Sequence, residues 1–535
     1  MVRADGVTRP TTFRVVLRCA VTMSHPKKFA RRSIYLAAIL GACVIASQAQ
    51  DRLARIDWLS RNTSPIRSID PTITDDDFTD LKPIMKAIGN SRIVVLGEES
   101  HGDGATFLAK VRLIKFLHQK MGFDVLAWEA GLFNCQEMDA AVRNPEIPIQ
   151  KAMSLGIYPI WATSAQVQPV FEYARSVAHT GGPLEMTGFD HQFSGSGGPG
   201  IRWRDAMMAF IDKADPSILP QSLRSSLIND TALVFNASTS PANLRAIKEK
   251  WKALPAVLDN SRTKLEAVHG IRYARLMRRT ADDAVISIEG LARFRESGGE
   301  FKSADNNIRD LRMAENLIWL ANERYKGRRI IVWAAAFHTL YDPSAIKLDA
   351  DSGFSYQDVV TMGEVAQKSL GRDIYTICFT AARGLAGNPM GSQTVEFETP
   401  KDGSLEDLWT HTGQKFSFMD FRMLPANHWL HQPLAARLLQ YSPIETDWTR
   451  QVDAVVFTRE MFPSSAGPLA PDKSALTMST FWGDSGLPVV QTKAPAILPG
   501  PLDSFAAGYA ARDAAPASDA TVPLRRCGSR SSLLW

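Results

Sequence analysis

Five short, mostly apolar runs along the chain have the character of buried β-strands. Apolar strands of this kind, separated by stretches of helical periodicity, predict a parallel sheet whose two faces are both covered by helices. The runs lie at residues 92–96, 124–128, 184–188, 329–333 and 373–379.

Helical patterns dominate the middle of the chain. Residues 107–121 place apolar side chains three and four positions apart, which predicts a helix directly after the first strand. Between about residues 201 and 325 no strand is indicated. We interpret this region as a helical insertion that covers a cleft, and enlarged crossover helices between two strands explain the pattern equally well. Its predicted helices lie at residues 202–213, 241–257, 263–295 and 306–325.

We therefore expect an α/β fold with a mainly parallel central sheet flanked by helices, a large helical insertion or lid, and a smaller C-terminal portion. Further elements are indicated after Gly384, at residues 405–408, 433–439 and 452–457. From residue 464 onward Pro, Ala, Ser and Gly dominate, which predicts a disordered tail. The predicted organisation is a first part of the core at 50–200, the helical insertion at 201–325, the remainder of the core at 326–463 and the tail at 464–535.

The N-terminal region has the pattern of an export signal. A cationic stretch at residues 26–32 precedes an apolar run at 33–46, and Ser47-Gln-Ala49 suits cleavage before Gln50. The run is too short for a membrane span, which needs about 20 apolar residues. We predict a signal peptide at 23–49 behind an upstream extension at 1–22. Leu40-Gly-Ala-Cys43 also resembles a lipobox, so the exported protein is expected to be periplasmic or secreted, or attached to a membrane by lipid on Cys43.

Composition excludes several classes of partner. Hydrophobic residues make up 45% of the chain and charged residues 22%, as in ordinary globular proteins. The formal net charge is only +5, and several of the positive charges lie in the terminal segments. Since no basic stripe with interleaved aromatic residues is present, we expect no nucleic-acid partner. The five cysteines lack Cys-x-x-Cys spacing, which argues against a zinc ribbon or a redox motif.

Ionisable residues follow four of the predicted strands, and in an open α/β sheet ligands bind beyond the carboxyl ends of the strands. One such residue would be weak evidence, because buried carboxylates and core histidines are common. Four strand ends that each carry one are difficult to explain by packing. In chain order these residues are Glu98 and His101, then Glu129, then Asp190 and His191, and finally His338.

This set of residues suits hydrolysis by an activated water molecule. Histidine exchanges protons near neutral pH, so His101 is expected to take a proton from water and return it to a leaving alkoxide. Glu98 or Glu129 would hold the imidazole in one tautomer or hold the water. His338 would stabilise the developing oxyanion or protonate the leaving group. No serine stands in a nucleophile elbow, so we do not expect a covalent acyl-enzyme.

The segment Leu96-Gly-Glu-x-x-His-Gly102, followed by a helix and a strand that ends in Trp128-Glu129, is similar to the opening of the erythromycin esterase family. The similarity covers most of residues 75–460, through Trp161, Gly188-Phe-Asp190, Arg309-Asp-x-x-Met-Ala-Glu-Asn316, Trp333 to His338 and Asp453-Ala-Val-Val-Phe457. The resemblance implies a carboxylic ester hydrolase, whose best-known relatives open a macrolide lactone without a cofactor. It also implies that His101 acts on water with help from carboxylates that match Glu98 and Glu129.

The chain departs from the family pattern at two places. The family's fourth strand typically ends Trp-Ala-His-Asn-x-His, whereas Ala335 and Ala336 replace the first histidine and the asparagine here. A family arginine corresponds to Lys110, which keeps the charge but loses the bidentate fork. A missing imidazole costs transition-state stabilisation unless His191 or His338 replaces it. We predict Glu98, His101, Glu129 and His338 as catalytic residues, and Lys110, Asp190, His191 and Arg309 as residues that bind a small ester substrate.

Two alternatives remain open at this point. The carboxylates and imidazoles at the strand ends could instead ligate a metal ion, although no His-x-x-x-His or Asp-x-His pair supports such a site; the candidate ligands are Glu98, His101, Glu129, Asp190 and His338. The broad fold also resembles that of small haem-binding lipoproteins, and Cys43 together with Ala335 and Ala336 would suit a binding protein without catalysis. A scaffold role in polysaccharide assembly has no direct support in the residues.

Overall fold

The computed structural model describes residues 46–298, 302–348, 354–387 and 394–467. The chain divides into two units, Met1–Asp57 and Trp58–Trp535. The predicted extension at 1–22, most of the predicted signal peptide, Cys43 and most of the predicted tail lie outside the described residues; residues 46–62 are helical. No helix within the described ranges combines the length and apolar character needed to cross a membrane.

A sheet of nine strands forms the centre of the second unit, in the order β1-β8-β11-β6-β2-β5-β3-β4, with β7 paired to β6. Neighbouring strands from β11 to β4 are all parallel. The predicted α/β fold with a mainly parallel sheet is therefore confirmed. The parallel strands are β2 (Ile93–Glu98), β3 (Phe123–Gly131), β4 (Glu185–Asp190), β5 (Arg329–Ala335), β6 (Ile374–Ala386) and β11 (Ala454–Met461).

Antiparallel strands complete one side of the sheet. β8 (Phe416–Asp420) pairs with β11, and β1 (Ser64–Pro65) pairs with β8. β7 (Val395–Glu396) pairs with β6, while β9 (Leu434–Leu439) and β10 (Ser442–Thr446) form a separate hairpin. The sequence pattern did not indicate β1, β7, β8 or β10, because strands of two to five residues carry little periodic signal.

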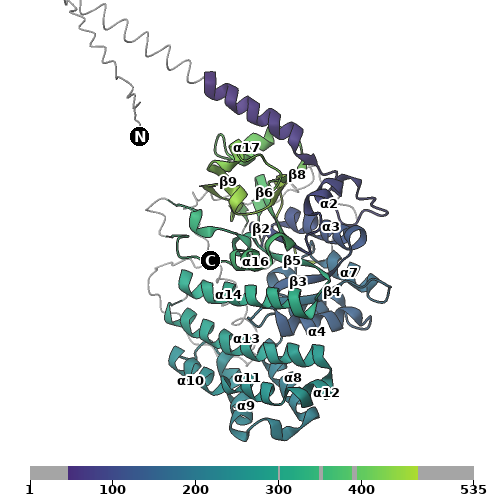
Figure 1. Cartoon of the computed structure of the whole chain (residues 1–535), viewed down its shortest axis with the longest axis vertical. Helices are drawn as coiled ribbons and strands as arrows, with labels where there is room; N and C mark the ends of the chain where they lie inside the picture. Colours follow the sequence, from purple (N-terminus) through teal and green to yellow (C-terminus); the bar gives the residue numbers. More distant parts are fainter. Residues whose placement is uncertain (1–45, 299–301, 349–353, 388–393, 468–535) are drawn as a thin grey trace, which may run out of the picture. The chain divides into compact units, whose positions relative to one another are not determined.

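The two faces of the sheet pack against different helices. Val94 and Leu96 belong to one core cluster, and Ile93 and Val95 belong to another, as the alternation of side chains along a strand requires. The first face is covered by α2 (Lys82–Ile88), α3 (Gly104–Met121), α4 (Leu132–Arg143), α5 (Ile149–Gly156), α6 (Pro159–Ala162) and α7 (Gln168–Val177). The second is covered by α14 (Ser303–Trp319) and α16 (Met362–Leu370) (Figure 1). Burial on both faces explains why the strands are almost continuously apolar.

Between β4 and β5 the described chain is helical. A separate core forms there around Trp203, Trp251 and Met277, and α14 lies between this part and the sheet, packing on the sheet through Met313 and Leu317 (Figure 1). The region therefore contains both a helical body of its own and a helix that covers the sheet. Its other helices are α8 (Pro199–Ala214), α9 (Gln221–Phe235), α10 (Pro241–Trp251), α11 (Ala253–Asn260), α12 (Arg262–His269) and α13 (Ile271–Glu296).

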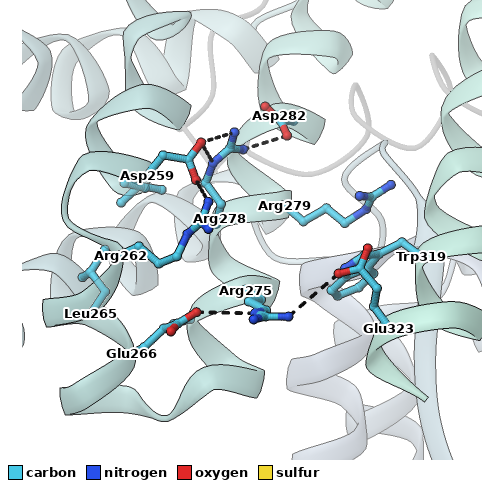
Figure 2. A pocket seen from close by; sticks show the side chains of 12 residues that line it. Asp259, Arg262, Leu265, Glu266, Arg275, Arg278, Arg279, Asp282, Trp319 and Glu323 are labelled. Carbon is cyan, nitrogen blue, oxygen red and sulfur yellow. Dashed lines mark hydrogen bonds and ion pairs between the residues drawn. The ribbon is translucent and has the colours of Figure 1, made fainter. Parts of the chain in front are cut away.

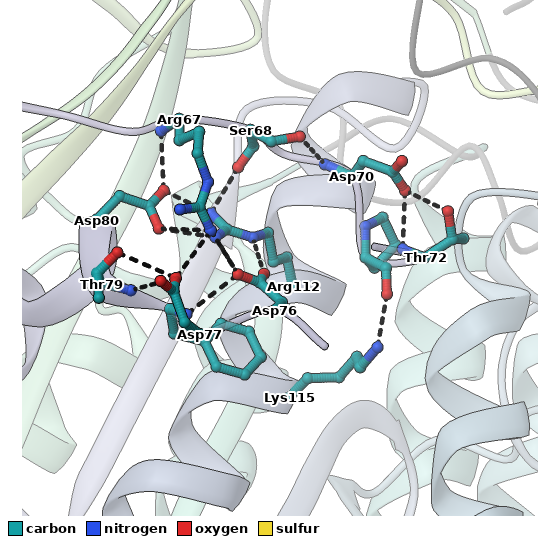
Figure 3. A network of polar contacts seen from close by, with 12 residues as sticks. Arg67, Ser68, Asp70, Thr72, Asp76, Asp77, Thr79, Asp80, Arg112 and Lys115 are labelled. Atoms are coloured by element: carbon teal, nitrogen blue, oxygen red, sulfur yellow. Dashed lines mark hydrogen bonds and ion pairs between the residues drawn. The ribbon is translucent and has the colours of Figure 1, made fainter. Parts of the chain in front are cut away.

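A polar network holds the segment before α2 against α3 (Figure 3). The buried Arg112 donates to Asp76 at 2.7 Å and to Asp80 at 2.8 Å. Burial raises the pKa of both carboxyls, but hydrogen bonds from Arg112 and from the backbone, together with the charges of Arg112 and Arg67, outweigh it and both pKa values are lowered. Asp76, Asp77 and Asp80 lie close enough to share a cation. Since each of the three carboxylates already pairs with Arg67 or Arg112, we interpret the network as an anchor for the chain that enters β2.

Candidate functional site

The topology of the sheet brings the ends of β2, β3 and β5 together. The chain leaves β2 to form β3 and β4, returns through β5 beside β2, and then continues to β6 on the other side of β2. The order of strands reverses at this point, and crevices at such reversals are the usual binding sites of parallel sheets. Glu98 and Glu129 lie in β2 and β3, and His338 lies in α15 (Ala336–Thr339) directly after β5.

Two glycines allow the turn after β2 to pack closely. A Cβ atom on Gly97 would lie 2.9 Å from Cys378 Sγ and 3.1 Å from Ala336 Cα, so a side chain there would displace β6 or α15. A Cβ atom on Gly102 would lie 2.6 Å from the backbone nitrogen of Gly387. Glycine is therefore required on both sides of the segment that carries Glu98 and His101.

Glu98 connects His101 to Lys110. His101 Nδ1 lies 3.3 Å from Glu98 Oε1, and the ammonium group of Lys110 donates to Glu98 Oε2. The Glu98 side chain is 0% exposed and that of His101 is 32% exposed. The His101 ring makes an edge contact with Trp161, with 5.2 Å between centroids. The imidazole is thus held from within by a carboxylate and an indole, while part of it reaches the surface.

Lys110, predicted to bind substrate, is fully buried on α3. Its Nζ donates to the backbone oxygen of Ala334 at 3.1 Å and lies 4.3 Å from the centroid of the Trp333 ring. Burial lowers the pKa of Lys110, and the charge of Glu98 opposes this effect. Its contacts make Lys110 the counter-ion that holds Glu98 in place.

Arg309 joins two further strand ends. Its Nη2 donates to Glu129 Oε1 at 2.8 Å and to Asp190 Oδ2 at 2.7 Å, and its Nε donates to Asp190 at 3.0 Å. Burial would raise the pKa of Glu129, but His338 and Arg309 outweigh it, so the pKa lies well below its usual range. His101 contributes to the same lowering. Glu129 is therefore a permanent anion within electrostatic range of His101.

His338 is a buried cation in this cluster. Its Nδ1 lies 2.9 Å from both carboxylate oxygens of Asp310, and its Nε2 lies 3.3 Å from Glu129 Oε1. Burial opposes a charge on the ring, but Asp310 and Glu129 prevail and raise the pKa of His338 to about 10. Arg309 Nη1 is 3.2 Å from the same Nε2. Because both groups are donors when His338 is protonated, we assign Glu129 as the hydrogen-bond acceptor of Nε2.

Asp310 is a member of the site that sequence reasoning missed. Its oxygens accept from the backbone N–H of Met362 at 2.8 Å and from Asn306 Nδ2 at 2.8 Å, in addition to His338. The side chain is fully buried. The available signal was its position beside Arg309 in a helix, which does not distinguish a buried carboxylate from an exposed one.

His191 makes its side-chain hydrogen bond outside the Arg309 cluster. Its Nδ1 lies 3.0 Å from Ser287 Oγ on α13, and the Ser287 hydroxyl donates to the His191 carbonyl at 2.7 Å. Burial lowers the pKa of His191 to about 4, so the ring is neutral. Of the two histidines considered as replacements for the missing family imidazole, His338 is the one that contacts Glu129.

The two alanines at the end of β5 lie beside the site. Ala335 stands opposite Glu98 in the register of β2 and β5, and its backbone N–H donates to Glu129 Oε2 at 2.8 Å. Ala335 therefore contacts Glu129 only through its backbone, and its methyl side chain supplies no imidazole at the position where the family typically has one. A metal site would require several acidic, His or Cys donors close enough to share one ion. In the described part of the chain, the group of acidic, His and Cys donors close enough to share an ion is Asp76, Asp77 and Asp80, outside this site.

The model of the family described as erythromycin esterase matches residues 118–461. The chain belongs to the erythromycin esterase family. It is therefore an erythromycin esterase-like hydrolase, and the matched range includes Glu129, Asp190, Arg309 and His338 and begins after Glu98, His101 and Lys110.

Related proteins extend over more of the chain. YbfO of Bacillus subtilis (strain 168), described as a hydrolase, is 26% identical over 423 residues, which cover 76% of this chain and 91% of that protein. Erythromycin esterase type II of Escherichia coli is 22% identical over 391 residues, or 69% of this chain and 89% of that protein. A mutant of erythromycin esterase EreC in its open conformation has the same fold, with a TM-score of 0.57, 16% identity, and coverage of 75% of this chain and 98% of that chain.

Proposed function

We propose that this protein is an exported carboxylic ester hydrolase that cleaves a macrolide lactone or a related ester with water activated by His101. The observation that carries the proposal is the setting of His101, which is partly exposed while its partner Glu98 is fully buried. Nδ1 faces Glu98, and no residue in the described ranges forms a hydrogen bond with Nε2. A carboxylate that accepts from Nδ1–H leaves the lone pair of Nε2 available for a proton from water.

In the proposed reaction, His101 Nε2 takes a proton as the water oxygen attacks the ester carbonyl carbon. When the bond to the alkoxide oxygen breaks, the imidazolium returns that proton to the leaving group, and the products are an acid and an alcohol. The formal charges of the buried groups near His101 do not cancel. Four carboxylates face three cations, so one negative charge remains uncompensated; the groups are Glu98, Glu129, Asp190 and Asp310 against Lys110, Arg309 and His338.

The second cluster has an electrostatic part in this mechanism. A pKa of about 10 makes His338 a poor proton donor at neutral pH, so it is proposed to act as a fixed charge. Together with Arg309 it keeps Glu129 ionised, and Glu129 in turn stabilises the positive charge that forms on His101.

The test is turnover of erythromycin and of a panel of aryl esters by the full chain, by His101→Ala and by Glu98→Gln. We expect kcat to fall by about 10²–10⁴-fold in His101→Ala, because a positioned acid–base group contributes that much. His118→Ala is the matched control, since His118 lies at the far end of α3 and contacts Tyr173. Ester turnover that survives in His101→Ala would contradict the mechanism, and turnover restricted to aryl esters would remove the macrolide from the proposal.

Export is the second part of the proposal and rests on the cationic and apolar pattern of residues 26–49. Mass spectrometry of the mature protein from its source cells tests it. A chain that starts at Gln50 would support cleavage, and a lipid-modified Cys43 would support membrane attachment. A mature chain that still contains residues 23–49 without lipid would refute export by this signal.

A further inference from the structure

A groove in the helical region lies outside the catalytic cluster. It has a volume of about 380 Å³ and is formed by α11, α12, α13, the end of α14 and the short helix η3 (Leu320–Arg324) that follows (Figure 2). Cavities of this size accommodate small organic molecules. The lining combines four arginines and four carboxylates with Trp319, Leu258 and Leu265.

Three of the four arginines in the groove are neutralised by its carboxylates. Arg278 lies 2.7 Å from both Asp259 and Asp282. Arg262 lies 2.9 Å from Asp259. The third is Arg275, which reaches Glu266 at 3.4 Å and Glu323 at 3.9 Å.

Arg279 is the exception. Its Nε donates to the amide oxygen of Asn316 at 2.5 Å, and its guanidinium lies 5.0 Å from the Trp319 ring. No carboxylate of the described residues lies within 4 Å of it. In Figure 2 the guanidinium extends beside Trp319 without an interaction with any other residue drawn.

The neighbouring Arg312 explains why Arg279 lacks an anionic partner. Arg312 binds Asp283 at 2.7 Å and Glu315 at 2.8 Å, and it lies 3.8 Å from Asp282. The carboxylates near Arg279 therefore already interact with Arg312. Burial and the charge of Arg312 lower the pKa of Arg279 to about 10, in keeping with a guanidinium that has no carboxylate within 4 Å among the described residues.

We propose that this groove binds a small, singly charged organic carboxylate through Arg279. The planar fork of a guanidinium matches a carboxylate, and the apolar body of the ligand would lie against Trp319, Leu258 and Leu265. Four arginines and four carboxylates give the lining no net charge, and only one guanidinium is without a carboxylate. A single negative charge is therefore favoured, since Glu266 and Glu323 would repel a second one.

Calorimetric titration of the full chain with benzoate tests the proposal, with benzamide as the uncharged analogue and inorganic phosphate as the small, more highly charged anion. We expect saturable one-to-one binding of benzoate, weaker binding of benzamide, and a loss of about tenfold or more in affinity for Arg279→Gln. Arg279→Lys keeps the positive charge but not the planar guanidinium, so its affinity for benzoate should lie between those of Arg279→Gln and the unmodified chain. Arg275→Gln is the matched control from the same groove and should change the affinity by less than about threefold.

Unfolding temperatures of the variants identify any loss of fold, and Arg279→Lys keeps the test valid if Arg279→Gln fails to fold. The proposal is overturned if benzoate does not bind saturably, if its affinity is the same in both Arg279 variants and the unmodified chain, or if benzamide binds as tightly. Phosphate that binds through Arg279 more tightly than benzoate would overturn the assignment to an organic carboxylate.

Discussion

Replacing Asp310 by Asn should lower the pKa of His338, so that its proton is released at a lower pH. Asp310 and Glu129 raise the pKa of His338 from its ordinary 6.5 to about 10 against the effect of burial. The difference of about 3.5 units corresponds to about 5 kcal/mol of preference for the charged ring. Asp310 makes the closer contact, at 2.9 Å against 3.3 Å for Glu129. We therefore expect at least half of this preference to disappear, so that the pKa of His338 in Asp310→Asn falls to about 8 or below.

Proton-detected NMR of chains with ¹⁵N-labelled histidine measures this value directly, and His338→Gln assigns the resonance. Asp305→Asn, on the same helix and paired with Arg293, is the matched control and should leave His338 unchanged. The reasoning is refuted if His338 in the unmodified protein already titrates near 6.5, or if Asp310→Asn leaves its pKa near 10.

The raised pKa of His338 also makes the stability of the fold depend on pH. Because the folded pKa of His338 exceeds the unfolded value, its contribution is fully present below about pH 6.5 and is lost as pH rises through about 10. Urea unfolding between pH 6 and 10 should therefore show a fall in stability that is much smaller in Asp310→Asn. An equal fall in both proteins would mean that other groups cause it.

Three further changes test other parts of the structure. Lys110→Met should reduce the free energy of unfolding by about 3–5 kcal/mol, because Glu98 would remain buried without its cation. Urea denaturation measures this change, with Lys120→Met at the end of the same helix as the control. An effect no larger than that of Lys120→Met would contradict the prediction. Ala335→His should raise kcat on esters by about tenfold or more, because it places an imidazole opposite Glu98, where it can act as an acid or a base. Unchanged rates would mean that the existing groups already supply this acid–base role. Burial raises the pKa of Asp103 to about 6. Its ionisation should therefore reduce stability as pH rises from about 4 through 6, by up to about 3 kcal/mol. Burial and the charge of Asp103 also raise the pKa of Glu99, so the melting temperature of Asp103→Asn should fall less over this range than that of the unmodified chain, and identical pH profiles would argue against the assignment.

The amino-acid sequence alone was sufficient for the parallel core of the fold. Residues 93–98 and 329–335 are recognisable as strands because strands buried on both faces must be apolar at nearly every position. Glycine on both sides of Glu98 and His101, and ionisable residues at successive strand ends, were enough to predict that these side chains gather at one edge of the sheet. These are local patterns, and each can be recognised without knowing what the residue contacts.

The roles within the site depended on the tertiary structure. Lys110 looks like a substrate ligand in the sequence, but α3 buries it against Glu98; His338 looks like an acid or a base, but the buried Asp310 keeps it charged. Arg279 likewise has no carboxylate within 4 Å among the described residues, because Arg312 binds the neighbouring ones. Protonation and charge pairing depend on burial and on partners distant in the sequence, so they are decided only when the helices pack on the sheet.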